Sequence, residues 1–369
     1  MNDRKARRRR SSNGFLDILN GLLGLLVLGL LLAGGVAFYG ASQFYGDGPL
    51  QADTTIRVEE GAGASLLAPQ LEEQGLISSR YVFLFGSRLA DIPGTIKQGD
   101  FRIPAGASMA DILTELRQGN PIRYAVVIPE GWTSWEAVQR LNSDSNITGE
   151  ITAIPPEGSL LPGSYDYVPG DTRQSVLDKM QAAMDTQLAA IWEARQPDLP
   201  LESPEQMLTL ASIVEKETGL ATERPQVAAV FVNRLREGMR LQSDPTIIYG
   251  ITNGQSTLDR GLRRSEIEEE TPYNTYQIDG LPPTPIANPG VDALNAVANP
   301  DSHDYLYFVA KGASPREGHV FAETYPEHQE NVARYREAEA QAAAQAEAEE
   351  ARQALEQQEA GDAPAPAAN

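Results

Sequence analysis

Two glutamates separated by one lysine, Glu215-Lys216-Glu217, are the residues whose type and spacing best suit acid catalysis. They end a segment whose apolar residues follow the 3.6-residue period of a helix with one buried stripe. On a helical wheel Glu217 continues this stripe, Lys216 points away and Glu215 lies on the other flank. Burial raises the pKa of a carboxyl group, so Glu217 would keep a proton near neutral pH and act as a general acid. An ordinary polar helix end would show the same spacing.

Two predicted helices position these glutamates. The first begins at Ser203-Pro204, an N-cap followed by a proline at the first helical position, and Gly219 closes it. The second begins at Pro225 and ends near Arg234 and Arg236, where the helix dipole favours basic groups. A substrate contact by Arg234 is the alternative to this structural role.

Polar residues that follow the second helix are candidates for contacts to a hydroxyl-rich ligand. Asp244-Pro245 is a helix-start signal, in which Asp244 would act as the cap and could also face a cleft. The loop 271–290 is rich in Asn, Thr and Tyr and stiffened by prolines, which suits sugar recognition as well as a plain crossover. The candidate substrate-binding residues are Asn233, Gln242, Asp244, Thr246, Tyr249, Tyr273, Asn274 and Tyr276.

Three sequence blocks occur in a fixed order in this region: ASIVEKET (211–218), FVNRLREGMRLQSDPTIIYGI (231–251) and TPYNTYQIDGLPPTPIANPG (271–290). Together they resemble the YceG-like endolytic murein transglycosylase family. The resemblance implies that Glu217, the second Glu of the E-K-E triplet, is the catalytic acid. One departure is Gly163, which stands where the family usually has an acidic residue, so we assign it no catalytic role.

The resemblance also implies the reaction. The enzyme would be a lytic transglycosylase that cleaves the MurNAc-GlcNAc bond of peptidoglycan and leaves 1,6-anhydro-MurNAc ends, thereby terminating or trimming nascent strands in cell wall biogenesis. Neither a metal nor a cofactor is implied. Its partners would be peptidoglycan glycan strands, the inner membrane and, as a further candidate, peptidoglycan synthases.

Two other functions stay open. A hydrolytic glycosidase would pair Glu217 with Glu215 or Asp244 and release a reducing sugar. A non-catalytic, membrane-anchored scaffold would bind glycan without cleaving it. A serine or metal hydrolase has little support, because the chain has no Gly-x-Ser-x-Gly motif and its three histidines lack metal-ligand spacing.

The N-terminal region predicts a single membrane span. A basic cluster at residues 4–10 precedes an almost wholly apolar stretch, Gly21 to Tyr39, which is long enough to cross a bilayer. The basic cluster predicts a cytoplasmic N-terminus and a periplasmic catalytic domain, in the inner (cytoplasmic) membrane. A cleaved signal peptide is the alternative, but the apolar stretch is long for one.

Composition restricts the remaining classes. The 369 residues carry a net charge of −21, although the first ten include six basic side chains, so the soluble part is strongly acidic and would repel nucleic acid. The chain has no cysteine, which excludes disulfides and thiolate metal sites. A hydrophobic share of 41% is enough for two modest cores.

A pattern of short strand, glycine turn, Ser or Thr, and amphipathic helix recurs at residues 56–71, 101–116 and 126–141. It resembles LysM-like modules, which the family places before its catalytic domain and which are associated with glycan contact. A purely structural role, holding the active domain away from the membrane, is the alternative. A Ser-, Thr-, Asn- and Pro-rich stretch at 142–156 is predicted to be the linker that follows.

The predicted fold class is therefore α+β, with one N-terminal transmembrane helix, a LysM-like βα repeat domain and an α+β transglycosylase domain. Within the last of these, periodicity predicts helices at 172–193 and 291–299 and paired strands at 305–310 and 319–322. The expected domains are a cytoplasmic basic tail (1–14), a transmembrane helix (15–41), a LysM-like domain (42–145), a catalytic domain (146–335) and a low-complexity, solvated tail (336–369).

Overall fold

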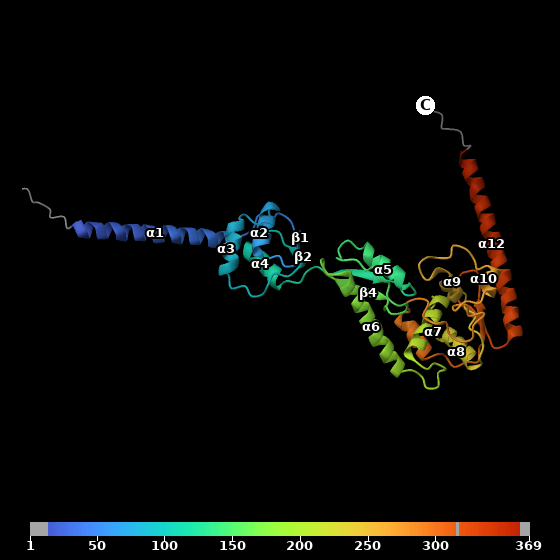
Figure 1. Cartoon of the computed structure of the whole chain (residues 1–369). Helices are drawn as coiled ribbons and strands as arrows, with labels where there is room; N and C mark the ends of the chain where they lie inside the picture. Colours follow the sequence, from blue (N-terminus) through green and yellow to red (C-terminus); the bar gives the residue numbers. More distant parts are fainter. Residues whose placement is uncertain (1–13, 315–316, 362–369) are drawn as a thin grey trace, which may run out of the picture. The chain divides into compact units, whose positions relative to one another are not determined.

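The computed structural model describes residues 14–314 and 317–361, and within them helices and short strands are mixed along the chain (Figure 1). These residues fold into two compact units. Unit 1 comprises the described residues up to Tyr124 together with Val168–Gly170; unit 2 comprises Ala125–Tyr167 and the described residues from Asp171 onward. Both contain helices and strands, so the predicted α+β class is confirmed. The basic cluster at 4–10 and the residues 362–369 lie outside the described residues.

Unit 1 begins with a long apolar helix, α1 (Gly14–Tyr45). Its segment Ile18–Tyr45 is the one stretch of the described chain whose length and composition would let it cross a membrane, and its side chains from Ile18 to Tyr39 are exposed. The end of α1 belongs to the globular part, because Phe44 is only 3% exposed and lies in the hydrophobic core of unit 1. The apolar helix and the folded unit are therefore one continuous structure.

The rest of unit 1 is a two-stranded antiparallel sheet with three helices. Its elements are β1 (Thr54–Val58), α2 (Ala64–Glu73), α3 (Arg80–Leu89), β2 (Gly99–Ile103) and α4 (Met109–Gln118). In the sheet, Ile56 pairs with Phe101, and both side chains point into the core. The first two predicted strand-turn-helix segments are thus confirmed as β1–α2 and β2–α4. The pattern did not predict α3.

Local capping explains where these helices begin. Ser108 caps α4 by accepting a hydrogen bond from the Asp111 backbone, 3.0 Å, while the Asp111 carboxylate accepts one from the Ser108 backbone. In α2 the residue before the helix is Gly63, which has no side chain for a cap, and Ser65, the serine of the first strand-turn-helix segment, lies inside the helix. The first of the three strand-turn-helix segments therefore departs from the shared pattern at its helix N-cap.

The third strand-turn-helix segment belongs mainly to unit 2. Strand β3 (Tyr124–Ile128) pairs with β4 (Gly163–Tyr167), and α5 (Ser134–Ser143) begins with a capping box between Thr133 and Glu136. The segment 142–156, where we expected a linker, packs into the same unit. Ile147 and Ile151 are buried, and the Asn142 side chain forms two hydrogen bonds with the backbone of Ile151. The division between the units falls earlier in the chain, at Tyr124.

Helix α7 (Pro204–Glu217) is the centre of unit 2 (Figure 1). It contacts four other helices: α6 (Arg173–Glu193), α8 (Arg224–Arg236), α9 (Asp244–Thr252) and α11 (Val291–Ala298). Every residue from Met207 to Val214 is buried. The predicted single buried stripe was therefore too narrow, because helices cover α7 on several sides. Its start is as predicted, since the Ser203 hydroxyl accepts a hydrogen bond from the Gln206 backbone.

The remaining elements are α10 (Arg264–Glu268), the antiparallel pair β5 (Tyr307–Ala310) and β6 (His319–Ala322), and α12 (Tyr325–Gly361). The first part of α12 packs on β5 and β6, and Asn331 there is buried. From Glu337 to Glu350 its side chains are almost all exposed, which agrees with the predicted solvated tail, and this part of the tail is helical. The predicted helices at 172–193 and 291–299 and the paired strands are confirmed.

Candidate active site

Glu217, the last residue of α7, is a partly exposed carboxyl group with a strongly shifted acidity. The Ser243 hydroxyl donates a hydrogen bond of 2.5 Å to its Oε1. Burial raises the pKa of Glu217 to about 7; the Ser243 hydrogen bond lowers it, the Asp244 charge raises it and the Arg234 charge lowers it. A helix C-terminus also disfavours a negative charge. Near neutral pH this group is therefore divided between its acid and its conjugate base, as acid–base catalysis requires.

Ser243 sits at the N-cap position of α9, but its hydroxyl does not cap the helix because it is directed to Glu217. Two threonines fix its backbone. The Ser243 N–H donates to Thr275 Oγ1 at 2.9 Å, and Thr246 Oγ1 donates to the Ser243 carbonyl at 2.6 Å. The prediction that Asp244 caps this helix was wrong, since α9 begins at Asp244 and the extended residue before it is the serine.

Asp244, Tyr276 and Arg234 complete the surroundings of Glu217. The Tyr276 hydroxyl donates a hydrogen bond of 2.7 Å to Asp244 Oδ1, and burial raises the pKa of this tyrosine. Arg234 is buried, which lowers its pKa, and it donates to the carbonyls of Leu306 (2.7 Å) and Leu241 (2.6 Å). Arg234 is therefore held beside the site by two hydrogen bonds to the backbone. This role is more specific than the predicted interaction with the helix dipole.

Three of the candidate substrate-binding residues are instead committed to internal hydrogen bonds. Thr246 is buried and supports Ser243. Asn274 is buried as well, and its amide donates to three backbone carbonyls between 266 and 269. The Asn233 amide donates to the carbonyls of His303 and Tyr305. These three side chains support the loops around the site. The amide N–H groups of Asn233 and Asn274 already donate to backbone carbonyls and are not directed at a ligand.

Tyr249 and Tyr273 belong to a second cluster, centred on Glu157. Their rings lie 5.1 Å apart, and Tyr249 lowers the pKa of the Glu157 carboxyl group. Glu157 also accepts hydrogen bonds from the Ser134 backbone (2.7 Å) and the Asn288 amide (3.2 Å), and burial raises its pKa. The last candidate, Gln242, is exposed and has a left-handed backbone with a φ of 51°.

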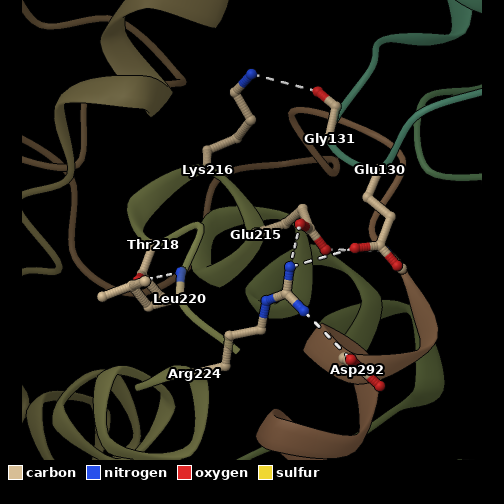
Figure 2. A network of polar contacts seen from close by, with 9 residues as sticks. Glu130, Gly131, Glu215, Lys216, Thr218, Leu220, Arg224 and Asp292 are labelled. Atoms are coloured by element: carbon tan, nitrogen blue, oxygen red, sulfur yellow. Dashed lines mark hydrogen bonds and ion pairs between the residues drawn. The ribbon is translucent and has the colours of Figure 1, made fainter. Parts of the chain in front are cut away.

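Glu215 faces a different environment, a polar network in which it contacts Arg224 (Figure 2). Its Oε1 accepts a hydrogen bond from Arg224 at 3.1 Å, and its Oε2 accepts one from the Gly290 backbone at 2.9 Å. The Glu215 side chain is 5% exposed, and burial raises its pKa while the Gly290 N–H and Arg224 lower it. Arg224 also pairs with Glu130 (3.2 Å) and Asp292 (3.4 Å). Glu215 thus links α7 to α8 and to the start of α11.

The sequence prediction missed Ser243, Thr275 and Arg224. Ser243 had a usable signal, because a serine directly before Asp-Pro is itself a preferred N-cap residue. Arg224 had none, since its three acidic partners are distant in sequence from one another. In residues 14–314 and 317–361 no group of three or more His, Asp or Glu side chains could hold a metal ion.

The YceG-like family model matches residues 56–334, which is more than half of the chain. The chain belongs to the YceG-like family. Among similar proteins is one of Streptococcus pneumoniae named endolytic murein transglycosylase, 28% identical over 366 residues, with 84% of this chain and 64% of that protein covered. A Bacillus subtilis protein of the same name is 27% identical, with 83% of this chain and 91% of that protein covered.

The chain thus spans 64% of the length of the Streptococcus relative. A solved YceG-like protein of Listeria monocytogenes is 26% identical and is matched with a TM-score of 0.48 over 76% of this chain and 99% of that one.

Proposed function

We propose that this protein is a membrane-anchored endolytic lytic transglycosylase that cleaves the MurNAc-GlcNAc bond of peptidoglycan and leaves 1,6-anhydro-MurNAc ends. The observation that carries the proposal is the partly buried Glu217 carboxyl group, with a pKa of about 7, at the end of the central helix of a YceG-like chain. The names of the Streptococcus and Bacillus relatives support the same substrate.

The proposed reaction uses one carboxyl group twice. Protonated Glu217 gives its proton to the glycosidic oxygen, and the bond from that oxygen to C1 of MurNAc breaks. The resulting carboxylate then takes the proton from the 6-hydroxyl of the same sugar, whose oxygen forms the new bond to C1. The proton count balances, and Glu217 is acidic again at the end. Because the attacking hydroxyl belongs to the same sugar, the step has the proximity advantage of an intramolecular reaction.

The neighbours of Glu217 suit both halves of this cycle. The Ser243 hydrogen bond stabilises the carboxylate that forms after proton donation and keeps that carboxylate oriented. The Asp244 charge raises the pKa of Glu217. Its negative charge would also stabilise the positive charge that develops at C1 in an oxocarbenium-like transition state. Tyr276 holds Asp244 in place through its 2.7 Å hydrogen bond. We assign substrate contacts to the exposed residues Gln242 and Asp244.

A hydrolytic glycosidase needs a second carboxylate to activate water or attack the sugar. Glu215 is poorly suited, since Arg224 and the Gly290 N–H occupy its two oxygens. Asp244 is the remaining candidate for such an enzyme, so the chemical nature of the product distinguishes the two reactions.

The test is digestion of purified peptidoglycan by the full chain, followed by mass spectrometry of the products. We expect 1,6-anhydro ends from the wild type and none from Glu217→Gln. Glu205→Gln is the matched control, because Glu205 is an exposed glutamate on the first turn of the same helix. Reducing ends in place of anhydro ends would identify a hydrolase, and full activity of Glu217→Gln would contradict the assigned acid.

We propose further that α1 spans the inner membrane with the N-terminus in the cytoplasm, and that unit 2 carries the catalytic activity in the periplasm. The basic residues 4–10 before the apolar helix support this orientation. A LysM-like contact to glycan is proposed for the β1–α2 and β2–α4 segments, and their repeated strand-turn-helix form supports it. Peptidoglycan synthases are the proposed protein partners.

A further inference from the structure

Helix α3 has an apolar face that the protein does not cover. Tyr81, Phe85 and Leu89 recur every four residues and are 69%, 67% and 69% exposed. On the opposite face Phe83 is fully buried in the core of unit 1. Spacing by four places the three exposed side chains in one row along the helix. Three large apolar side chains in an exposed row are typical of a surface that binds another apolar partner.

The same face borders α1, and the two helices form a groove of about 800 Å³. The α1 wall consists of residues between Leu32 and Tyr45, and the α3 wall includes Tyr81, Phe85 and Leu89. Not one of the lining residues is charged. The groove thus continues the apolar surface of the candidate membrane span into unit 1.

Specific contacts fix α3 against the end of α1, next to which Figure 1 draws it. The Phe44 ring lies so close to Gly86 that a Cβ added there would fall 2.2 Å from the ring. The Ser78 hydroxyl, just before α3, donates a hydrogen bond of 3.0 Å to Gln43 of α1. The two helices therefore keep one relative position within unit 1.

We infer that the exposed face of α3 is embedded in the interface of the membrane that α1 spans, and that lipid acyl chains occupy the groove between α1 and α3. A bilayer around α1 has to meet this groove, because α1 residues from Leu32 onward line it. The apolar segment of α1 has 28 residues, whereas a hydrocarbon core of about 30 Å needs about 20. Its last turns therefore extend into the interfacial region, where α3 lies.

The composition of α3 fits this position. Tyr81 is an aromatic residue with a polar end, the type that favours membrane interfaces, and the Arg80 guanidinium lies 5.1 Å from its ring centre. Arg88 is exposed beside Leu89, and no residue of the helix is acidic. An arginine at this depth can extend its charge to lipid phosphates while its aliphatic part stays in apolar surroundings.

This second contact with the membrane goes beyond the proposed reaction and depends only on α1 spanning a bilayer. One helix leaves the attached unit free to rotate and tilt at the membrane surface. A second helix embedded beside it would hold unit 1 at a defined depth and orientation. The occupants that compete with lipid are a second copy of the chain and another protein.

The absence of cysteine allows a direct test on the full chain. Phe85→Cys is labelled with an environment-sensitive fluorophore and reconstituted into vesicles of phosphatidylethanolamine and phosphatidylglycerol. Spin-labelled acyl chains then quench any label within the bilayer. Val27→Cys on α1 is the label inside the span, and Glu60→Cys, an exposed residue in the turn after β1, is the label in water.

We expect quenching at position 85 at least twofold greater than at position 60, with blue-shifted emission, at every protein density. Equal emission at 85 and 60, with quenching retained at 27, would overturn the inference and leave the anchor intact. Loss of quenching at 85 as protein density increases would show that a second copy covers the face, which also overturns it. None of these outcomes depends on catalysis, so they are distinct from failure of the proposed reaction.

Discussion

Glu215 and Glu217 are two residues apart on one helix, yet their surroundings direct them to different tasks. Glu215 has both oxygens engaged by Arg224 and the Gly290 N–H, which makes it part of the framework. Glu217 has one hydrogen bond, from a neutral hydroxyl, and an acidic neighbour. A carboxylate that faces a guanidinium is stabilised as an anion, whereas one that is buried beside a hydroxyl keeps its proton longer. We therefore propose Glu217, and not Glu215, as the acid of the site.

Ser243→Ala and Asp244→Asn are expected to shift the acidity of Glu217 in opposite directions. The Ser243 hydrogen bond lowers the pKa of Glu217, so its loss should move the alkaline limb of the pH–rate profile above pH 7. The Asp244 charge raises this pKa, so its neutralisation should move the limb below pH 7, and asparagine can still accept the hydrogen bond from Tyr276. The measurement is kcat against pH on isolated glycan strands. Shifts of both variants in the same direction would contradict the assigned electrostatics.

Glu217→Gln is expected to stabilise unit 2 at alkaline pH. The native pKa is about 7 and the unperturbed value is 4.5, so between these values the unfolded state loses its proton first. Wild-type stability therefore falls as the pH rises from 4.5 to 7 and stays lower above it, by at most about 3 kcal/mol. Glutamine does not ionise and avoids this cost.

Urea unfolding followed by tryptophan fluorescence measures this difference, because all three tryptophans (132, 135 and 192) lie in unit 2. The gain of the variant over the wild type should be near zero at pH 4 and largest at pH 8. An equal gain at both pH values would show that it arises from packing and not from the proton.

At the scale of elements, sequence patterns predicted those features that depend on neighbouring residues. The Ser or Thr that precedes α4 and α5, the Ser203 start of α7 and the β5–β6 pair were all predicted from short stretches of sequence. The resemblance, and not the spacing, selected Glu217 from the triplet. Its helical-wheel position agrees with the structure only in part, because α7 is buried on several sides.

Features that depend on distant residues were not predictable in this way. Arg224 meets Glu130, Glu215 and Asp292, which come from three separate parts of the chain. The polar composition of 142–156 favoured a linker, but Ile147 and Ile151 are buried, and Arg173 of α6 donates hydrogen bonds to the carbonyls of Asn142 and Asp144. Asn274 and Asn233 have the chemistry of sugar-binding residues and instead satisfy backbone carbonyls, since buried carbonyl groups require donors.

Arg224→Met is expected to destabilise unit 2 by about 3–5 kcal/mol, because it leaves the buried Glu215 carboxylate without its cation. Adding Glu215→Gln should restore a large part of the loss, since the unpaired charge is then removed. Tryptophan fluorescence during urea unfolding gives both values. The alkaline limb of the pH–rate profile should stay where it is in any folded variant, because Arg224 is not among the groups that shift the pKa of Glu217. If the double variant recovers no stability, Arg224 stabilises unit 2 through its packing and not through its charge.

At the scale of the whole molecule, the apolar helix α1 is both the candidate membrane span and a part of the fold of unit 1. Its last turn supplies Phe44 to the core of unit 1, and the ring fills the space that Gly86 leaves on α3. A chain that begins at Asp47 would therefore lack a core side chain, although it would retain every residue of the sheet and of α2 to α4. A chain that begins at Phe38 would keep that side chain without the full span.

Phe44→Ala in the full chain is expected to cost unit 1 about 3–5 kcal/mol, as a large buried aromatic leaves a cavity. Tyr45→Ala is the matched control, because Tyr45 is the next residue and is 64% exposed. Hydrogen exchange of the β1 and β2 amides in detergent resolves the two, since these strands belong to unit 1 and exchange through its unfolding. Faster exchange should appear in Phe44→Ala and in the chain that begins at Asp47, and not in Tyr45→Ala. Unchanged protection in the shortened chain would mean that α1 does not contribute to the stability of unit 1.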